Sequence, residues 1–304
     1  MAYTLIRGEF VIRYANSPNQ GPEPDGDTIK FEADNLDLVR GLPQPSGRPP
    51  AINGRGGVNV RLEAIDALET HFENKHQEKD GAYKARDELL RLLGFTDVEF
   101  FPSNPGRVKS ASQNSLPGFV LSNGIDVNGR MIGFIYKDSM VWDADGSNAE
   151  ADGSTVAVDT AKVDQSLNTA LLSHGHVYPA FYGTLPTTLR EHLAAKSEAA
   201  RGNGLGLWPR STADRNGAAN VDSEETLQGL VIWPKLFRRV VSYFAANHDN
   251  FDNFDTWLRG GGAGRDDEIF RLDTHKPARL HDVVDASGSE LRLTLWPEQF
   301  VIQP

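Results

Sequence analysis

Apolar and polar residues alternate in several short runs in the first half of the chain, which is the pattern of half-buried β-strands. In residues 58–65, for example, Val60 lies on the apolar face and Arg61 on the polar face. Residues 130–137 are apolar on both faces, as expected for a central strand of a barrel. Together these runs predict strands at 9–15, 28–31, 58–65, 97–101 and 130–137.

Apolar residues three or four positions apart predict amphipathic helices between and after these strands. The first helix covers residues 80–93 and stops at Gly94, a second covers about 163–174, and a third follows Pro186. Strands and helices in this arrangement predict an α+β fold, namely a five-stranded Greek-key β-barrel of the OB type with three helices.

This predicted barrel domain occupies residues 1–215, and residues 216–304 are predicted to form a small accessory α+β segment of open role. Pro234 separates two helical patterns in that segment, and short apolar runs after them predict strands. Its aromatic residues favour packing, a homo-oligomer or a protein partner over a free tail. Within the barrel domain, polar stretches are expected to be inserted loops at 41–57, 102–118 and 138–160.

The composition is that of an ordinary globular protein without cysteine. At 304 residues, 39% hydrophobic and 24% charged, the chain can form one large domain or two ordinary ones. Any metal ion has to be bound through oxygen or imidazole. Because the N-terminus lacks the apolar segment of a signal peptide and no run could span a membrane, we expect a cytoplasmic protein. The net charge of −11 differs from the basic surface usual in nucleic-acid binders.

Carboxylates and arginines gather in three segments: PDGDTIKF at 24–31, VRLEAIDALE at 60–69 and NGR at 128–130. Ca²⁺ and Mg²⁺ prefer oxygen ligands and often leave positions open for a substrate phosphate. Arginine forks bind phosphate oxygens in pairs. The segments therefore predict a metal ion that acts on a phosphate, with a site drawn from Asp25, Asp27, Arg61, Asp66, Glu69 and Arg130.

In their order, these segments resemble the staphylococcal-nuclease-like (thermonuclease) family over roughly residues 8–210. The matching segments are DGDTIKF, RLEAIDALET, GAYKARDELLRLLG, NGRMIGFIY, SLNTALLSHGHVYPAFY and LREHLAAKSEAARGNGLGLW. The ordered set is much more specific than any single segment. The resemblance implies a nuclease fold with Ca²⁺ as the metal, and Mg²⁺ or Mn²⁺ as alternatives.

The resemblance implies a metal site built mainly from carboxylates. Asp27 and Asp66 match the family's metal-ligating acids, Ala67 matches a residue that ligates through its backbone carbonyl, and Asp25 matches a nearby acid. The chain departs from the pattern at Leu68, where the family usually has proline. Leucine removes a restraint on φ just before the catalytic position, so the rigidity of this loop has to come from elsewhere.

The catalytic and substrate-binding roles are likewise implied by the resemblance. Glu69 matches the family's general base, and Arg61 and Arg130 match its two phosphate-contacting arginines. Phe181 and Tyr182 lie where the family places aromatic residues near the nucleotide, although packing in the core is an equal alternative for both.

Two classes of function follow from these residues. The first is a metal-dependent endonuclease of low sequence specificity that hydrolyses DNA, RNA or both and leaves 3′-phosphate ends. The alternative is an OB-fold module that binds nucleic acid or protein without catalysis. The acids and arginines favour the enzyme, and residues 216–304 are expected to restrict access to it or to bind a partner.

Overall fold

The computed structural model describes residues 2–140 and 150–303. By their internal contacts they form two compact units, called here the barrel unit (Met1–Glu63 and Arg86–Leu171) and the second unit (Ala64–Ala85 and Leu172–Pro304). The boundary expected at residue 215 stays a prediction. Part of the expected insertion at 138–160, residues 141–149, lies outside the described residues.

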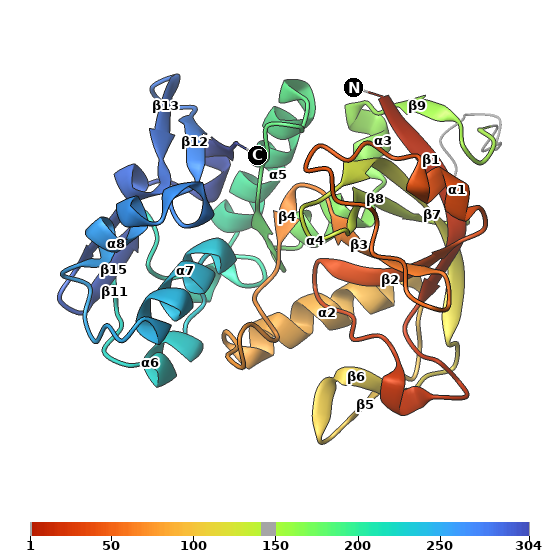
Figure 1. Ribbon diagram of the computed structural model, residues 1–304, viewed down its shortest axis with the longest axis horizontal. Coiled ribbons are helices and arrows are strands. Elements are labelled where there is room, and N and C mark those ends of the chain that lie inside the picture. Colours follow the sequence, from red (N-terminus) through yellow and green to blue (C-terminus); the bar gives the residue numbers. More distant parts are fainter. Residues whose placement is uncertain (1, 141–149, 304) are drawn as a thin grey trace. The chain divides into compact units, whose positions relative to one another are not determined.

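Five strands of the barrel unit close into a barrel of mixed direction, which confirms the barrel predicted from the sequence (Figure 1). Around the barrel, β1 pairs with β2, β2 with β3, β3 with β8, β8 with β7, and β7 with β1. The β3–β8 pair is parallel and the other four pairs are antiparallel. The strands are β1 (Ala2–Val11), β2 (Thr28–Ala33), β3 (Gly57–Leu62), β7 (Ser115–Ile125) and β8 (Met131–Lys137).

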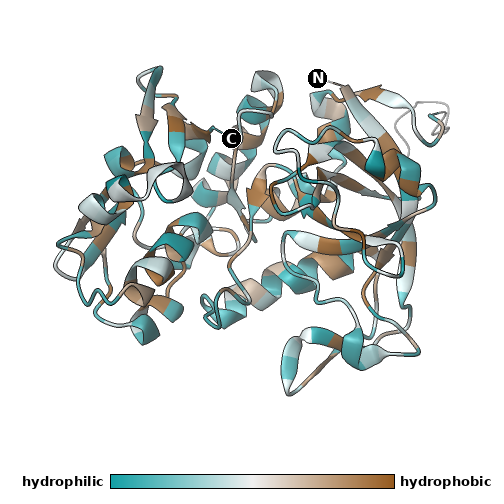
Figure 2. Cartoon of the chain, viewed as in Figure 1, coloured by the Kyte–Doolittle hydropathy of each residue, from teal (hydrophilic) through white to brown (hydrophobic). Residues whose placement is uncertain are grey.

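The alternating pattern of the sequence builds the barrel core. Ile29 and Phe31 of β2 are buried, as are Val58, Val60 and Leu62 of β3. Figure 2 shows hydrophobic and hydrophilic residues interleaved along the strands. Closure depends on β1, which pairs with β7 along most of its length and with β2 from Gly8 onward. A Cβ atom at Gly8 would lie 2.2 Å from the carbonyl oxygen of Glu32, so only glycine permits this approach.

The remaining elements of the barrel unit differ in part from the sequence prediction. Residues 102–118, expected to be a loop, contain the strand β6 and the start of β7. The helix expected at about 163–174 is divided into α3 and α4, because the Ser166 side chain donates to Val163 O of α3 and accepts from Thr169 N of α4. The bounds are α1 (Leu36–Arg40), β5 (Glu99–Phe101), β6 (Asn104–Ser110), β9 (Thr155–Ala157), α3 (Thr160–Asp164) and α4 (Leu167–Ser173).

The second unit is also a mixture of helices and short strands. β4 (Ile65–Asp66) pairs with β10 (Tyr178–Pro179), and two three-stranded sheets follow in the orders β11-β15-β14 and β13-β12-β16. Its helices are α5 (Thr187–Gly202), α6 (Glu224–Gln228), α7 (Pro234–Ala245) and α8 (Phe254–Gly260), and α2 (Lys79–Leu93) begins in it. The other strands are β11 (Ala219–Asn220), β12 (Glu268–Arg271), β13 (Lys276–Arg279), β14 (Val284–Ser287), β15 (Glu290–Leu293) and β16 (Phe300–Ile302).

The five α-helices that the described residues form before position 215 do not confirm the expected count of three. A single apolar cluster holds the second unit together. It combines Leu68, Tyr178 and Trp208 with residues from beyond position 215, such as Trp233 and Phe237. Among the helices described, none has the length and hydropathy needed to cross a membrane.

Candidate functional site

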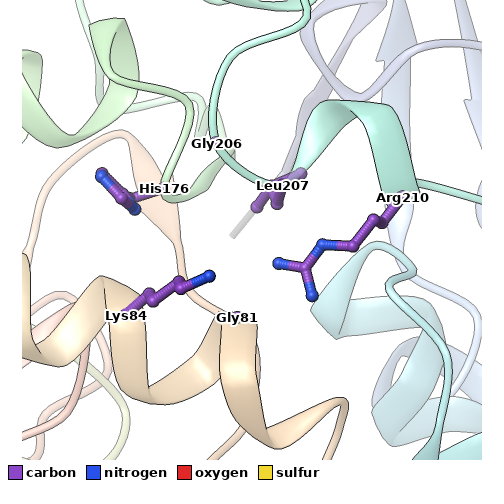
Figure 3. A pocket seen from close by; sticks show the side chains of 6 residues that line it. All are labelled: Gly81, Lys84, His176, Gly206, Leu207 and Arg210. Carbon is purple, nitrogen blue, oxygen red and sulfur yellow. The ribbon is translucent and has the colours of Figure 1, made fainter.

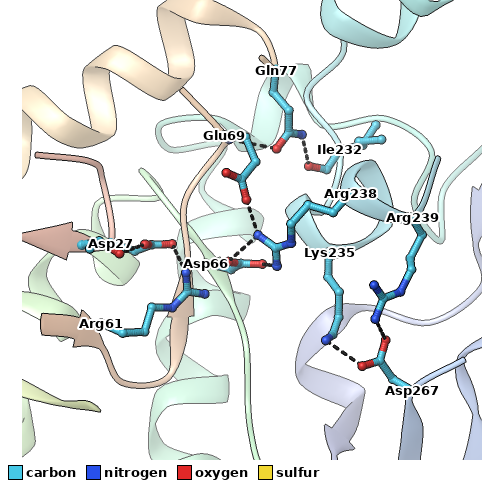
Figure 4. A network of polar contacts seen from close by, with 11 residues as sticks. Asp27, Arg61, Asp66, Glu69, Gln77, Ile232, Lys235, Arg238, Arg239 and Asp267 are labelled. Atoms are coloured by element: carbon cyan, nitrogen blue, oxygen red, sulfur yellow. Dashed lines mark hydrogen bonds and ion pairs between the residues drawn. The ribbon is translucent and has the colours of Figure 1, made fainter. Parts of the chain in front are cut away.

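Asp27 is buried and forms an ion pair with the partly buried Arg61 (Figure 4). Asp27 directly precedes β2, and the register of β2 with β3 sets its neighbour Thr28 opposite Arg61. The Arg61 Nη1 lies 2.9 Å from Asp27 Oδ2, and Thr28 Oγ1 donates to Oδ1 at 2.8 Å. Asp25 shapes the preceding turn, since its carboxylate accepts from Gly26 N at 2.7 Å. The predicted acid and arginine are therefore brought together by strand register.

Arg130 is held in a tight turn that leads into β8. The Asp126 carboxylate accepts from Arg130 Nε at 2.7 Å and also from the backbone N–H of Arg130 and of Asn128. The Arg130 side chain is 28% exposed. Within residues 2–140 and 150–303, its two terminal nitrogens have no hydrogen-bond or ion-pair partner. The turn thus fixes one edge of the guanidinium and leaves the other edge available for an anion.

Asp66 and Glu69 lie in the second unit, and their carboxylates converge on one cation, the guanidinium of Arg238 (Figure 4). Arg238 Nη2 lies 3.0 Å from Asp66 Oδ2. Arg238 Nη1 contacts both acids, with Asp66 Oδ1 at 3.4 Å and Glu69 Oε1 in a short ion pair. The Asp66 side chain is only 2% exposed, so it has to be paired to stay ionised. We call Asp66 and Glu69 the carboxylate pair.

The loop that carries Glu69 is fastened to the chain just before α7. The buried side chain of Gln77 accepts from Glu69 N at 3.0 Å and donates to Ile232 O at 2.8 Å. A backbone bond from Gln77 N to Glu69 O closes the loop at 2.8 Å. One amide therefore couples the position of Glu69 to the start of the helix that carries Arg238.

Leu68 gives the same loop an apolar anchor. It is fully buried in the cluster of the second unit, and a Cβ atom at Gly81 of α2 would lie 2.7 Å from its Cδ1. Neighbouring Ala67 is also buried. Packing thus restrains the loop at the position where the resembling family uses proline, and the predicted backbone ligand Ala67 lies beside that anchor.

The two aromatic residues predicted to contact bases lie in different environments. Phe181 is fully buried, which fits the alternative of core packing. Tyr182 is partly buried, and Lys235 Nζ lies 5.8 Å from the centroid of its ring. The role of both residues in binding nucleotides stays a prediction.

Glu63 is a buried acid that sequence reasoning did not single out. It follows β3, is 3% exposed, and has an Oε2 atom without a hydrogen-bond partner among the described residues. Burial raises the pKa of its carboxyl group to about 7, although the Asn123 amide and the charge of Arg61 act in the opposite direction. Burial, and after it the charge of Glu63, raises the pKa of the Tyr3 hydroxyl as well. Glu63 is thus set to exchange its proton near neutral pH.

A pocket of about 250 Å³ in the second unit is lined by three basic side chains, Lys84, His176 and Arg210 (Figure 3). Acidic residues already compensate two of them. Lys84 Nζ lies 2.8 Å from Asp80, and Arg210 Nη1 lies 2.6 Å from Glu78. Two of the three cations that line the pocket are therefore already neutralised by acidic partners.

No protein-family model matches the chain, and no match is found among curated proteins. The assignment of the chain to the nuclease-like family therefore stays a prediction from the segments of the sequence. What the structure adds is Arg238, a residue that sequence reasoning missed. Its only trace in the sequence is a basic residue on a helix with a strong apolar face, which is an ordinary feature of surface helices.

Proposed function

We propose that the chain is a metal-dependent phosphodiesterase, specifically an endonuclease of low sequence specificity that acts on DNA, RNA or both. The observation that carries the proposal is the convergence of the carboxylate pair. Oxygens of Asp66 and Glu69 both reach one nitrogen of Arg238, so both can reach one cation. Such a set of carboxylate oxygens is what Ca²⁺, Mg²⁺ and Mn²⁺ prefer.

In this proposal, Asp66 would hold a divalent ion, and the expected roles of Asp27 and of the Ala67 carbonyl as further ligands stay predictions. When bound, the ion would supply positive charge that polarises a phosphate group and offsets its charge in the transition state. Glu69 orients the attacking water and accepts its proton. Arg61 and Arg130 would bind phosphate oxygens, a role that the partly exposed, forked guanidinium of Arg130 fits by its accessibility.

Two substitutions test the proposal. Cleavage of single-stranded DNA, double-stranded DNA and RNA is measured with Ca²⁺, Mg²⁺, Mn²⁺ or chelator, and the product ends are mapped for 3′-phosphate. We expect Glu69→Gln and Arg130→Ala each to reduce the rate constant about 100-fold or more, because each removes a group that acts in the transition state.

Matched controls are Glu73→Gln and Arg48→Ala, which change exposed residues of the same types and should leave the rate unchanged. Cleavage that needs no metal, or that survives both substitutions in the predicted site, would reject the mechanism.

A second candidate is a binding module without catalysis. One observation favours it: the acids and arginines are paired within the protein, Asp27 with Arg61, Arg130 with Asp126, and the carboxylate pair with Arg238. Such pairs also serve as purely structural networks. Retention of nucleic acid in a binding assay, without cleavage under any metal condition, would support the module over the enzyme.

A further inference from the structure

Arg238 occupies the position on the carboxylate pair that a metal ion would take. Its Nη1 contacts one oxygen of Asp66 and one of Glu69, and its Nη2 contacts the second oxygen of Asp66 (Figure 4). The guanidinium therefore uses three of the four oxygens that the pair offers. A divalent ion ligated by the same oxygens would require this contact to open, because two cations repel each other at such short range.

The fold holds Arg238 in this position by several independent contacts. Pro234 begins α7, and the buried residues Phe237 and Val241 set the orientation of the helix. Lys235 and Arg239, one turn apart, both pair with Asp267 at 2.8 Å. This ion-pair triad fixes the rotation of α7 and so directs the intervening Arg238 to the carboxylate pair.

The loop bearing the carboxylates is fastened to the same region. Gln77 connects Glu69 to Ile232, and Lys75 forms a short ion pair with Glu224 of α6. Several contacts therefore hold the loop close to α7, which distinguishes the contact of Arg238 with the carboxylate pair from an incidental surface ion pair. The Arg238 side chain is 20% exposed, so it has access to water when it is displaced.

Together these contacts lead to an inference that rests on the proposed function. We propose that Arg238 is an internal competitor for the divalent cation at the carboxylate pair, so that binding of metal requires α7 to release this arginine. The arginine keeps the buried Asp66 and the partly buried Glu69 paired while no metal is bound. It also raises the metal concentration at which the site fills, and the segment after residue 215 thereby controls the site.

The test compares the full-length protein with Arg238→Ala, Arg238→Gln and the control variant Arg259→Ala. Calorimetric titration measures the affinity for Ca²⁺, and thermal unfolding is followed in chelator and in saturating Ca²⁺. Without its competitor, Arg238→Ala should bind Ca²⁺ about tenfold more tightly than the wild type, the scale expected for loss of a close charge pair. Arg259→Ala, which removes an exposed arginine–carboxylate ion pair on α8 and leaves the contacts that hold α7 in place, should bind Ca²⁺ as the wild type does.

Unfolding separates competition from a merely structural role. In chelator, Arg238→Ala should have a lower Tm than the wild type, because the buried Asp66 loses its cation. Saturating Ca²⁺ should raise its Tm by more than it raises that of the wild type, since tighter binding stabilises more. A lower Tm that Ca²⁺ does not restore, with affinity unchanged or weaker, would overturn the inference.

If Arg238→Ala does not fold in chelator, the affinity for Ca²⁺ is measured with Arg238→Gln instead, because glutamine keeps hydrogen-bonding groups and removes the charge. It should also bind Ca²⁺ more tightly than the wild type, and unchanged affinity would overturn the inference. Cleavage assays on the same variants keep the two proposals separate. If Arg238→Ala binds Ca²⁺ more tightly and no variant cleaves nucleic acid, the proposed nuclease activity is refuted and the role of Arg238 as competitor stands. If cleavage depends on metal but Arg238→Ala binds Ca²⁺ with unchanged affinity, the competitor role is refuted and the nuclease activity stands.

Discussion

At the scale of single residues, Glu63 shows how burial sets chemistry. Its carboxyl group has an ordinary pKa of 4.5 when exposed and, because of burial, a pKa of about 7 in the folded protein. Below about pH 4.5 the folded and unfolded chains both carry the proton. Between these two values the unfolded chain loses the proton while the folded chain keeps it. The contribution of Glu63 to stability is therefore complete below pH 4.5 and is lost as the pH rises through 7.

We predict that Glu63→Gln stabilises the protein above pH 7 by on the order of 3 kcal/mol, since each pKa unit corresponds to about 1.4 kcal/mol. Below pH 4.5 the difference should vanish. Urea unfolding at pH 4.5 and pH 8 measures both values, with the exposed Glu73→Gln as control. The same pH dependence in the wild type and in Glu63→Gln would refute the prediction.

At the scale of elements, one side chain joins α4 to the barrel sheet. Asn168 is buried near the start of α4 and accepts a hydrogen bond from Ile135 N of β8 at 3.0 Å. Its Nδ2 donates to Glu63 O at 2.9 Å and to Gly133 O at 3.1 Å. Gly133 O also accepts from Glu63 N at 2.9 Å, so two backbone groups, Ile135 N and Glu63 O, depend on this amide. The SLNTALL segment belongs to the matched family segments, yet the sequence alone did not show this role for Asn168.

Asn168→Ala should therefore lower the free energy of unfolding by about 2 kcal/mol or more, because it leaves two buried backbone groups unpaired and each costs roughly 1–3 kcal/mol. Chemical unfolding followed by circular dichroism measures the change. Asn128→Ala, at an exposed turn position, is the matched control and should change stability little. A loss below about 1 kcal/mol for Asn168→Ala would mean that water replaces the amide.

At the scale of the whole molecule, the apolar cluster of the second unit joins residues on both sides of position 215. Leu68, Tyr178 and Trp208 come before this position, and Trp233 and Phe237 come after it. Deletion of residues 216–304 should leave the first three exposed. We expect the truncated chain to lose cooperative unfolding and to bind a hydrophobic dye. Truncation that leaves both the Tm and any nuclease activity unchanged would show that the segment is a dispensable addition.

The sequence by itself indicated all or part of the barrel strands β1, β2, β3 and β8, whereas β7 begins in a stretch expected to be a loop and the strand expected at 97–101 forms β5 outside the barrel. These predictions depend on periodicity, which is a local property: Val58, Val60 and Leu62 are buried as their alternation predicts. Local pattern failed where a single side chain redirected the chain, as Ser166 does between α3 and α4. The sequence also identified the acids and arginines as candidate site residues, because carboxylates bind metal ions and guanidinium groups bind phosphate oxygens.

Only the tertiary structure decided which charges are paired and which groups are buried. Asp66 and Arg238 are 172 positions apart, and no periodicity connects them. The charge state of Glu63 likewise depends on the atoms around it rather than on its neighbours in sequence. Burial and electrostatic pairing act through space, so the partner of a buried acid becomes known only when the fold has brought the two together.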